Sequence, residues 1–169
     1  MSVSTVAALP PATALFHEEQ YFDWRVYAII AAVETLTAMG FLHRNAWSRE
    51  LIAGVAIGML LLLSLAVVVL RMTTEVTPTE VRVWFGWIPI YRREIPAAGI
   101  KRVEPTSFRP IADYGFWGVR AGRDGERVLI ARGGRGVRIE LVDGSTFVIG
   151  SQRTEELALA IQSAIRPVG

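Results

Sequence analysis

Hydrophobic positions divide the chain into a continuously apolar part and an alternating part. Residues 51–70 form an uncharged run of twenty residues that Arg71 ends. As a helix, a run of this length spans about 30 Å, the thickness of the hydrocarbon core of a bilayer. No face of this helix carries the polar stripe that is typical of a soluble core helix. The pattern therefore predicts a membrane-spanning helix over residues 51–70.

A second apolar run, over residues 24–42, predicts another membrane-spanning helix that is interrupted by Glu34. Aromatic residues flank this run, as they do at membrane interfaces; they are Tyr21, Phe22, Trp24 and Trp47. The polar residues 43–50 are long enough for a tight connection. We expect a two-helix hairpin within residues 21–72, with both termini on one side of the membrane.

Residues 1–20 contain Pro10-Pro11 and many small residues without periodicity, so we expect a flexible tail. They lack the cationic segment of a secretory signal peptide. Residues 71–169 carry fifteen Lys or Arg against eleven Asp or Glu. Basic segments beside membrane helices favour the cytoplasmic side, which predicts a cytoplasmic domain and cytoplasmic termini.

After Thr74 the pattern changes to the alternation that is typical of strands. Seven short strands are predicted, at residues 81–86, 88–95, 100–108, 114–121, 127–132, 137–142 and 145–150. Asp143-Gly144 is a strong hairpin signal, and residues 133–136 are expected to form another hairpin turn because they lack the ending of a phosphate-binding loop. Close strand spacing favours an antiparallel sandwich or barrel.

The last segment, from Thr154 to Arg166, has helical spacing. Its apolar face comprises Leu157, Ala158, Ile161, Ala164 and Ile165. Thr154 is a candidate N-cap, and Glu155 and Glu156 suit the positive end of a helix. We expect this helix to close an open side of the sheet, and we expect residues 73–169 to fold without the membrane segment.

The stretches GVRIELVDGSTFVIGSQRTEELALAI (136–161) and YGFWGVRA (114–121) resemble bacterial pleckstrin-homology (PH)-like domains of membrane-anchored proteins. The similarity covers roughly residues 73–166. It implies a seven-stranded bent sandwich that is capped by a C-terminal helix, often preceded by two membrane spans. It implies no enzymatic activity, since such domains share none. The basic cluster of phosphoinositide-binding members is replaced here by the apolar stretch WFGWIPI (84–90).

Composition argues against catalysis and metal binding. The chain has no cysteine, and its two histidines, His17 and His43, lie outside the predicted β domain. That domain would then have no imidazole or thiolate for a metal site or a catalytic dyad. We expect neither an enzyme nor a cofactor, and we expect no nucleic-acid partner, because stacking platforms and a groove-binding motif are not evident.

The candidate functional positions in the membrane segment are Glu34, Gly54 and Gly58. An ionised Glu34 would be costly there, by at least ~2.5–3.5 kcal/mol. It could bond to a partner subunit, hydrogen-bond within the hairpin, or take part in a proton relay. Gly54 and Gly58 form a small-residue face that allows close helix packing, either inside the hairpin or against another subunit.

Two further surfaces are candidates in the β domain. Trp84, Trp87 and Ile88 form an apolar hairpin tip close to the second span, which would contact the membrane or a partner protein. The basic residues of two neighbouring predicted strands are expected to share one basic face; they are Arg92, Arg93, Lys101 and Arg102. That face is either ordinary solvated surface or a site for anionic lipid.

These patterns favour a non-catalytic accessory or scaffold subunit that stabilises a larger complex of integral membrane proteins in a bacterial inner membrane, such as a photosynthetic or respiratory complex. Hairpin anchoring, the apolar tip and the small-residue helix faces support this interpretation. The alternative is a sensor of anionic lipid headgroups or of the envelope state, acting through the basic face.

Overall fold

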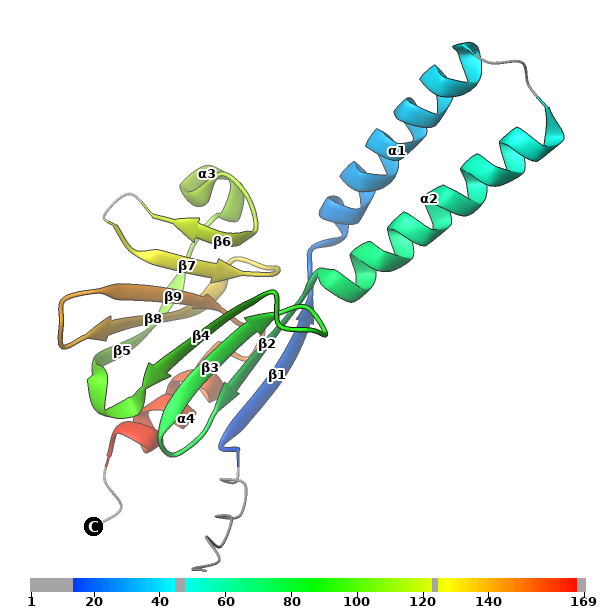
Figure 1. Ribbon diagram of the computed structural model, residues 1–169. Helices are drawn as coiled ribbons and strands as arrows, with labels where there is room; N and C mark the ends of the chain where they lie inside the picture. The colour runs from blue at the N-terminus through cyan, green and yellow to red at the C-terminus, as the bar shows by residue number, and fades with distance from the viewer. Residues whose placement is uncertain (1–13, 45–47, 123–124, 167–169) are drawn as a thin grey trace, which may run out of the picture.

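The computed structural model describes residues 14–44, 48–122 and 125–166 (Figure 1). A pair of long helices projects from a domain that is built of two sheets and a C-terminal helix. The elements are β1 (Phe16–Tyr21), α1 (Trp24–Arg44), α2 (Arg49–Val69), β2 (Arg71–Val76), β3 (Glu80–Phe85), β4 (Tyr91–Pro96), the 3-10 turn η1 (Ala97–Gly99), β5 (Ile100–Ser107), α3 (Pro110–Tyr114), β6 (Gly118–Ala121), β7 (Arg127–Ile130), β8 (Arg135–Leu141), β9 (Thr146–Gly150) and α4 (Thr154–Ile165).

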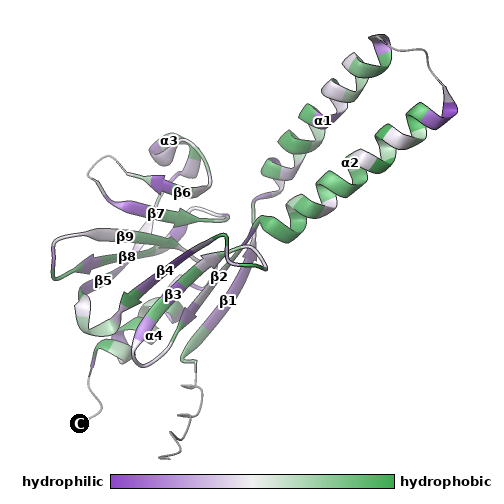
Figure 2. Cartoon of the chain, in the orientation of Figure 1, coloured by the Kyte–Doolittle hydropathy of each residue, from purple (hydrophilic) through white to green (hydrophobic). Residues whose placement is uncertain are grey.

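The two projecting helices are the predicted apolar segments. Each is long and apolar enough to cross a membrane, and hydrophobic residues cover most of their surface (Figure 2). Ser48 begins α2, since its hydroxyl oxygen accepts a hydrogen bond from the backbone N–H of Leu51 at 3.2 Å. None of the residues of α2 is buried within the chain. Apolar surface of this extent requires a lipid or protein environment.

The first sheet has the order β1-β2-β3-β4, and all its pairs are antiparallel. The strands β1 and β2 were not predicted, so the structure has nine strands where seven were expected. The segment from Phe16 onward is therefore a strand of the domain and not part of a tail. Since β1 precedes α1 and β2 follows α2, the helical hairpin is inserted between two paired strands, and the domain does not begin at residue 73.

The polarity of these two strands explains why they were missed. The inward positions of β1 are Phe16, Glu18 and Gln20, so its buried face is mostly polar and gives no apolar alternation. In β2, Thr73 and Thr74 are both buried, which also breaks the alternation. Period-two hydrophobicity detects a strand only when one face is apolar.

The second sheet has the order β5-β8-β9-β7-β6. Its pairs are antiparallel except for β7 and β9, which are parallel. The predicted turn at Asp143-Gly144 does join β8 to β9: Gly144 has φ +84°, and Asp143 Oδ1 accepts the N–H of Ser145 at 2.8 Å. Residues 133–136, in contrast, do not form a hairpin turn. They lead from β7 to β8, two strands that have β9 between them.

Both sheets contribute to one hydrophobic core, which α4 completes. This helix contacts β1 and β2 of the first sheet and β5 and β8 of the second. Leu157 and Ile161 are fully buried, as the apolar spacing predicted. Thr154 is not the N-cap: the cap position is Arg153, because the Thr154 hydroxyl donates back to the carbonyl of Ser151 at 3.1 Å.

Candidate functional site: the helix-facing end of the domain

Short connections fix the domain against the helices. Only Phe22 and Asp23 separate β1 from α1, and only Leu70 separates α2 from β2. Hydrogen bonds join these segments: the N–H of Phe22 and the hydroxyl of Tyr27 both donate to the carbonyl of Leu70, at 3.3 and 3.0 Å. The N–H of Asp23 donates to the carbonyl of Ala131 at 3.0 Å. One end of the domain is therefore held close to the base of the helical hairpin (Figure 1).

The turn between β3 and β4 lies at this same end and exposes a set of large apolar side chains. The register Met72↔Phe85 places this turn next to the residues that leave α2. Trp87, Ile88 and Ile90 are 70%, 83% and 69% exposed. The tight turn needs Gly86, which has φ +88° and whose Cβ, if added, would lie 2.7 Å from the carbonyl oxygen of Ile88. We call Trp87, Ile88 and Ile90 the apolar tip.

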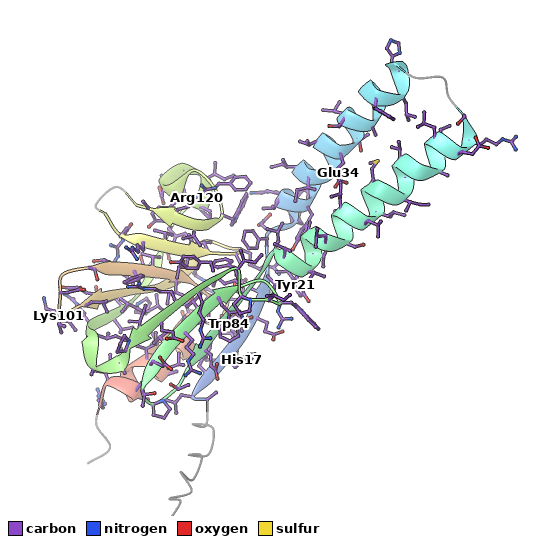
Figure 3. All side chains as sticks on the ribbon, viewed as in Figure 1. His17, Tyr21, Glu34, Trp84, Lys101 and Arg120 are labelled. Atoms are coloured by element: carbon purple, nitrogen blue, oxygen red, sulfur yellow. The ribbon has the colours of Figure 1, made fainter. Side chains whose placement is uncertain are left out.

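Trp84 does not belong to this tip. It lies within β3, opposite Thr73 on one side and Arg92 on the other, and its side chain is half-buried on the outer face of the first sheet (Figure 3). Trp87 is instead covered on one side by Arg71, whose guanidinium lies 5.6 Å from the ring centroid. Sequence reasoning missed Ile90, the third member of the tip.

Glu34 lies on the side of α1 that faces α2 (Figure 3). It borders a hollow of about 380 Å³ between the helices, which Val55 and Gly58 of α2 also line. A second hollow of about 250 Å³ between the same helices also touches Glu34. The carboxyl group has no hydrogen-bond partner among the described residues. Both hollows have mostly apolar linings, so this group lacks the donor that a carboxyl requires in lipid.

The two glycines of the predicted packing face are not in tight contact within the hairpin. Gly58 faces α1 and is half-buried, whereas Gly54 is exposed. A Cβ added at either position would meet no described atom within 4 Å. The interpretation that these glycines allow close packing inside the hairpin is therefore wrong, because α1 and α2 do not approach closely at either of them.

The four predicted basic residues are divided between the sheets, with Arg92 and Arg93 on β4 and Lys101 and Arg102 on β5. Three of them have carboxylate partners: Arg92–Glu94 at 2.6 Å, Lys101–Glu140 at 2.7 Å and Arg102–Glu104 at 2.5 Å. The hydrogen bond from Lys101 lowers the pKa of Glu140 below its ordinary value. The guanidinium of Arg93 lies 4.9 Å from the ring centroid of Phe147. Lys101 is also far from the helices (Figure 3). These residues do not form one face of free positive charge.

A buried acidic cluster was not predicted from the sequence. Glu126 is 6% exposed and accepts hydrogen bonds from the hydroxyl of Tyr114 at 3.0 Å and from Arg138 Nη1 at 2.5 Å. Burial and the Glu126 carboxylate raise the pKa of Tyr114 to about 12. Both partners satisfy the buried charge, so the cluster joins α3 and β8 to Glu126, the residue that precedes β7. Nothing in the local sequence pairs these three distant positions.

His17 was expected to lie outside the β domain, but it is part of β1 and therefore of the first sheet. Its half-exposed ring lies 3.4 Å from Glu19 Oε1. The described residues include no group of three or more His, Asp or Glu side chains that could hold a metal ion. His43 lies near the end of α1 that points away from the domain (Figure 1).

In comparisons with known proteins, no protein-family model matches the sequence, and no curated protein matches it either. The class that the structure defines is a domain of two sheets and a C-terminal helix, with two long apolar helices inserted between its first two strands.

Proposed function

We propose that this chain is a non-catalytic accessory or scaffold subunit that binds and stabilises a larger complex of integral membrane proteins. In this proposal α1 and α2 cross a bacterial inner membrane, and the domain is a PH-like module on the cytoplasmic side. The proposed larger complex is a photosynthetic or respiratory assembly.

The observation that carries the proposal is the surroundings of Glu34. A carboxyl group between two apolar helices, without a donor in the described chain, is costly unless another molecule supplies one. The hollows on both sides of it leave room for side chains of a neighbouring helix. The uncontacted glycines, Gly54 and Gly58, offer surfaces that a further helix can approach closely.

The apolar tip gives the same partner a second point of attachment outside the helices. Exposed aromatic side chains are frequent at the energetic centre of protein interfaces. Because the tip lies at the end of the domain that is hydrogen-bonded to the base of the helices, a single membrane protein could contact both. The basic residues support the alternative of an anionic-lipid sensor less well, since their charges are paired and dispersed.

The topology is tested with reporter fusions. A reporter at Gly169 should be cytoplasmic and one inserted at position 46, between the two helices, should be on the opposite side. The physical reason is that both ends of the hairpin leave from the same end of the domain. A reporter at Gly169 that is found outside the cytoplasm would contradict the proposed orientation.

Partner binding is tested by co-purification in mild detergent. We expect Trp87→Ala and Glu34→Ala to release the protein from its complex. Truncating a Trp at an interface centre commonly costs ~2–4 kcal/mol, which is roughly a thirty- to thousand-fold loss of affinity. Loss of the intramembrane carboxyl should act in the same direction by removing a hydrogen bond that only the partner supplies.

Each of these variants has a matched control. Arg102→Ala removes an exposed side chain of the domain that is paired with Glu104, and should change affinity little, with an effect that fades in salt. Thr35→Ala alters the residue next to Glu34, whose hydroxyl donates only to the carbonyl of Ala31 in its own helix. The lipid sensor would be favoured instead if the Trp87→Ala variant still co-purifies with the complex while variants of the basic residues do not. Those residues are Arg92, Arg93, Lys101 and Arg102.

A further inference from the structure

A cavity of about 450 Å³ lies where α1 begins, at the end of the domain that faces the helices. Three distant segments and Trp117, which lies between α3 and β6, line it. Asp23 and Arg25 come from the start of α1, Phe108 to Ala112 come from the approach to α3 and from α3 itself, and Gly133-Gly134 come from the connection between β7 and β8. The hydrogen bond from the N–H of Asp23 to the carbonyl of Ala131 holds the first and third segments together.

Two guanidinium groups line the cavity, and neither has a close ion pair with a carboxylate of the described chain. Arg25 is exposed and has no carboxylate within 4.0 Å among the described residues. Arg109, whose side chain is 84% exposed, reaches its only described partner, Asp113, at 4.0 Å. That contact is made to Asp113 Oδ1, while Asp113 Oδ2 accepts the backbone N–H of Arg109 at 2.6 Å. This differs from the basic residues of β4 and β5, where three of the four lie within 2.7 Å of a carboxylate.

One carboxylate is also present in the cavity. Asp23 Oδ1 accepts the backbone N–H of Arg25 at 3.1 Å, which caps the first turn of α1. The group accepts no other hydrogen bond from the described residues. The wall between these polar groups is apolar, and Pro110, Ile111 and the buried indole of Trp117 contribute to it.

The position of the cavity indicates what could enter it. Trp24, which begins the candidate span, lies between Asp23 and Arg25 in the sequence. In a membrane-inserted chain these residues are at the level of the lipid headgroups, where Trp and Arg are common. Guanidinium groups that line one cavity suit a phosphate group, and apolar walls suit the glycerol and upper acyl region of a lipid. The carboxylate would repel a purely anionic headgroup but would attract an ammonium group.

We propose that this cavity binds the headgroup of an amine-bearing phospholipid of the phosphatidylethanolamine class. The phosphate lies against Arg25 and Arg109, and the primary ammonium group donates to the free oxygen of Asp23. The proposal rests on the membrane insertion in the proposed function but not on the identity of any protein partner. It assigns the lipid contact to a place other than the basic residues of β4 and β5.

The test is native mass spectrometry of the full-length protein, purified in detergent and incubated with equal amounts of phosphatidylethanolamine, phosphatidylcholine and phosphatidylglycerol of identical acyl chains. The wild-type protein should retain phosphatidylethanolamine most strongly. Arg109→Gln and Arg25→Gln should each lower retention of this lipid by about tenfold, the loss expected for one charge-assisted hydrogen bond. Inorganic phosphate in large excess should not displace it.

Asp23→Asn separates recognition of the amine from the stability of the helix. Asn keeps the side-chain oxygen that caps α1, and it caps helices as well as Asp does. The variant should keep its fold and lose the preference for phosphatidylethanolamine over phosphatidylcholine. Arg102→Gln and Glu104→Gln, which change exposed charges on β5, are the matched controls and should bind as the wild-type protein does.

Equal retention of the three lipids, a preference for phosphatidylglycerol, displacement by inorganic phosphate alone, or insensitivity to the Arg25 and Arg109 variants would each overturn the proposal. All four outcomes leave the accessory role intact. Extraction of the chain from membranes by alkaline carbonate would instead overturn both proposals, because the chain would then not be inserted in the bilayer.

Discussion

A chain that begins at Thr73 should fail to fold, whereas a chain that runs from residue 14 with residues 23–69 replaced by Asn-Gly should form a soluble, folded domain. The first chain lacks β1 and the first two residues of β2, although it contains every strand that the sequence pattern predicted. The second keeps all nine strands. The two chains therefore separate the strand-pairing requirement from any requirement for the membrane helices.

The cost of losing β1 follows from its contacts. Phe16 is 6% exposed, and burying a side chain of this kind is worth about 1.5–3 kcal/mol. Glu18 accepts hydrogen bonds from the Ser151 hydroxyl at 2.6 Å and from the backbone N–H of Gln152 at 3.0 Å. Gln20 donates to the carbonyl of Gly150 at 3.0 Å. With about 1 kcal/mol for each of these three hydrogen bonds, the losses reach the lower end of the ~5–15 kcal/mol that stabilises a typical domain.

The replacement is feasible because of the register between the strands. Tyr21 is paired with Arg71, and the N–H of Phe22 donates to the carbonyl of Leu70, so a two-residue turn can close the hairpin. Among the buried core residues of the domain only Val26 is removed. Circular dichroism, gel filtration and urea unfolding measure the outcome. A cooperative transition in the chain that begins at Thr73 would contradict the role given to β1.

Ile161→Asp should unfold the domain, while Leu159→Asp should leave it folded. Ile161 is fully buried in the face of α4 that contacts both sheets, whereas Leu159, two residues earlier in the same helix, is 63% exposed. The first change removes core packing, at about 2–5 kcal/mol. It also forces a carboxyl group into an apolar site at a cost of several kcal/mol more. The second change loses mainly helix propensity, about 0.5 kcal/mol.

Urea unfolding of both variants, in the soluble chain with the Asn-Gly turn, gives the comparison directly. The Leu159→Asp midpoint should stay close to that of the parent, and Ile161→Asp should show no folded baseline. If both variants unfold with similar midpoints, α4 does not complete the core and its contacts with the two sheets are of little energetic value.

Most of the second sheet, the helices and the β3–β4 hairpin could be predicted because each has a local periodic signal. The strands β5, β8 and β9 alternate clearly, and α4 shows helical spacing. The strands β1 and β2 gave no such signal, because Glu18, Gln20 and Thr74 are buried polar residues. The hydrogen bonds of Glu18 and Gln20 are made to residues 150–152, which lie far away in the sequence. Local patterns also cannot show that β9 pairs between β7 and β8, since pairing order is a property of the whole sheet.

The candidate surfaces show the same division. The apolar tip was predictable, since large apolar residues around a turn cannot all be buried. The expected basic face depended on which strands are neighbours and on carboxylates that lie far away in the sequence, such as Glu140 beside Lys101. The cavity at the start of α1 could not be predicted, because the residues that line it are far apart in the sequence, from Asp23 to Gly133.

In the proposed membrane arrangement, the insertion of the helices between β1 and β2 makes correct membrane integration a condition for folding. During synthesis β1 emerges first and has no partner until both helices and β2 have followed. Pairing of β1 with β2 requires that α1 and α2 together return the chain to the side of the membrane on which β1 lies. A chain that integrates only one of them leaves β1 and β2 on opposite sides of the bilayer, with Phe16, Glu18 and Gln20 unpaired. Such a chain exposes an incomplete sheet to the proteases that remove unfolded proteins.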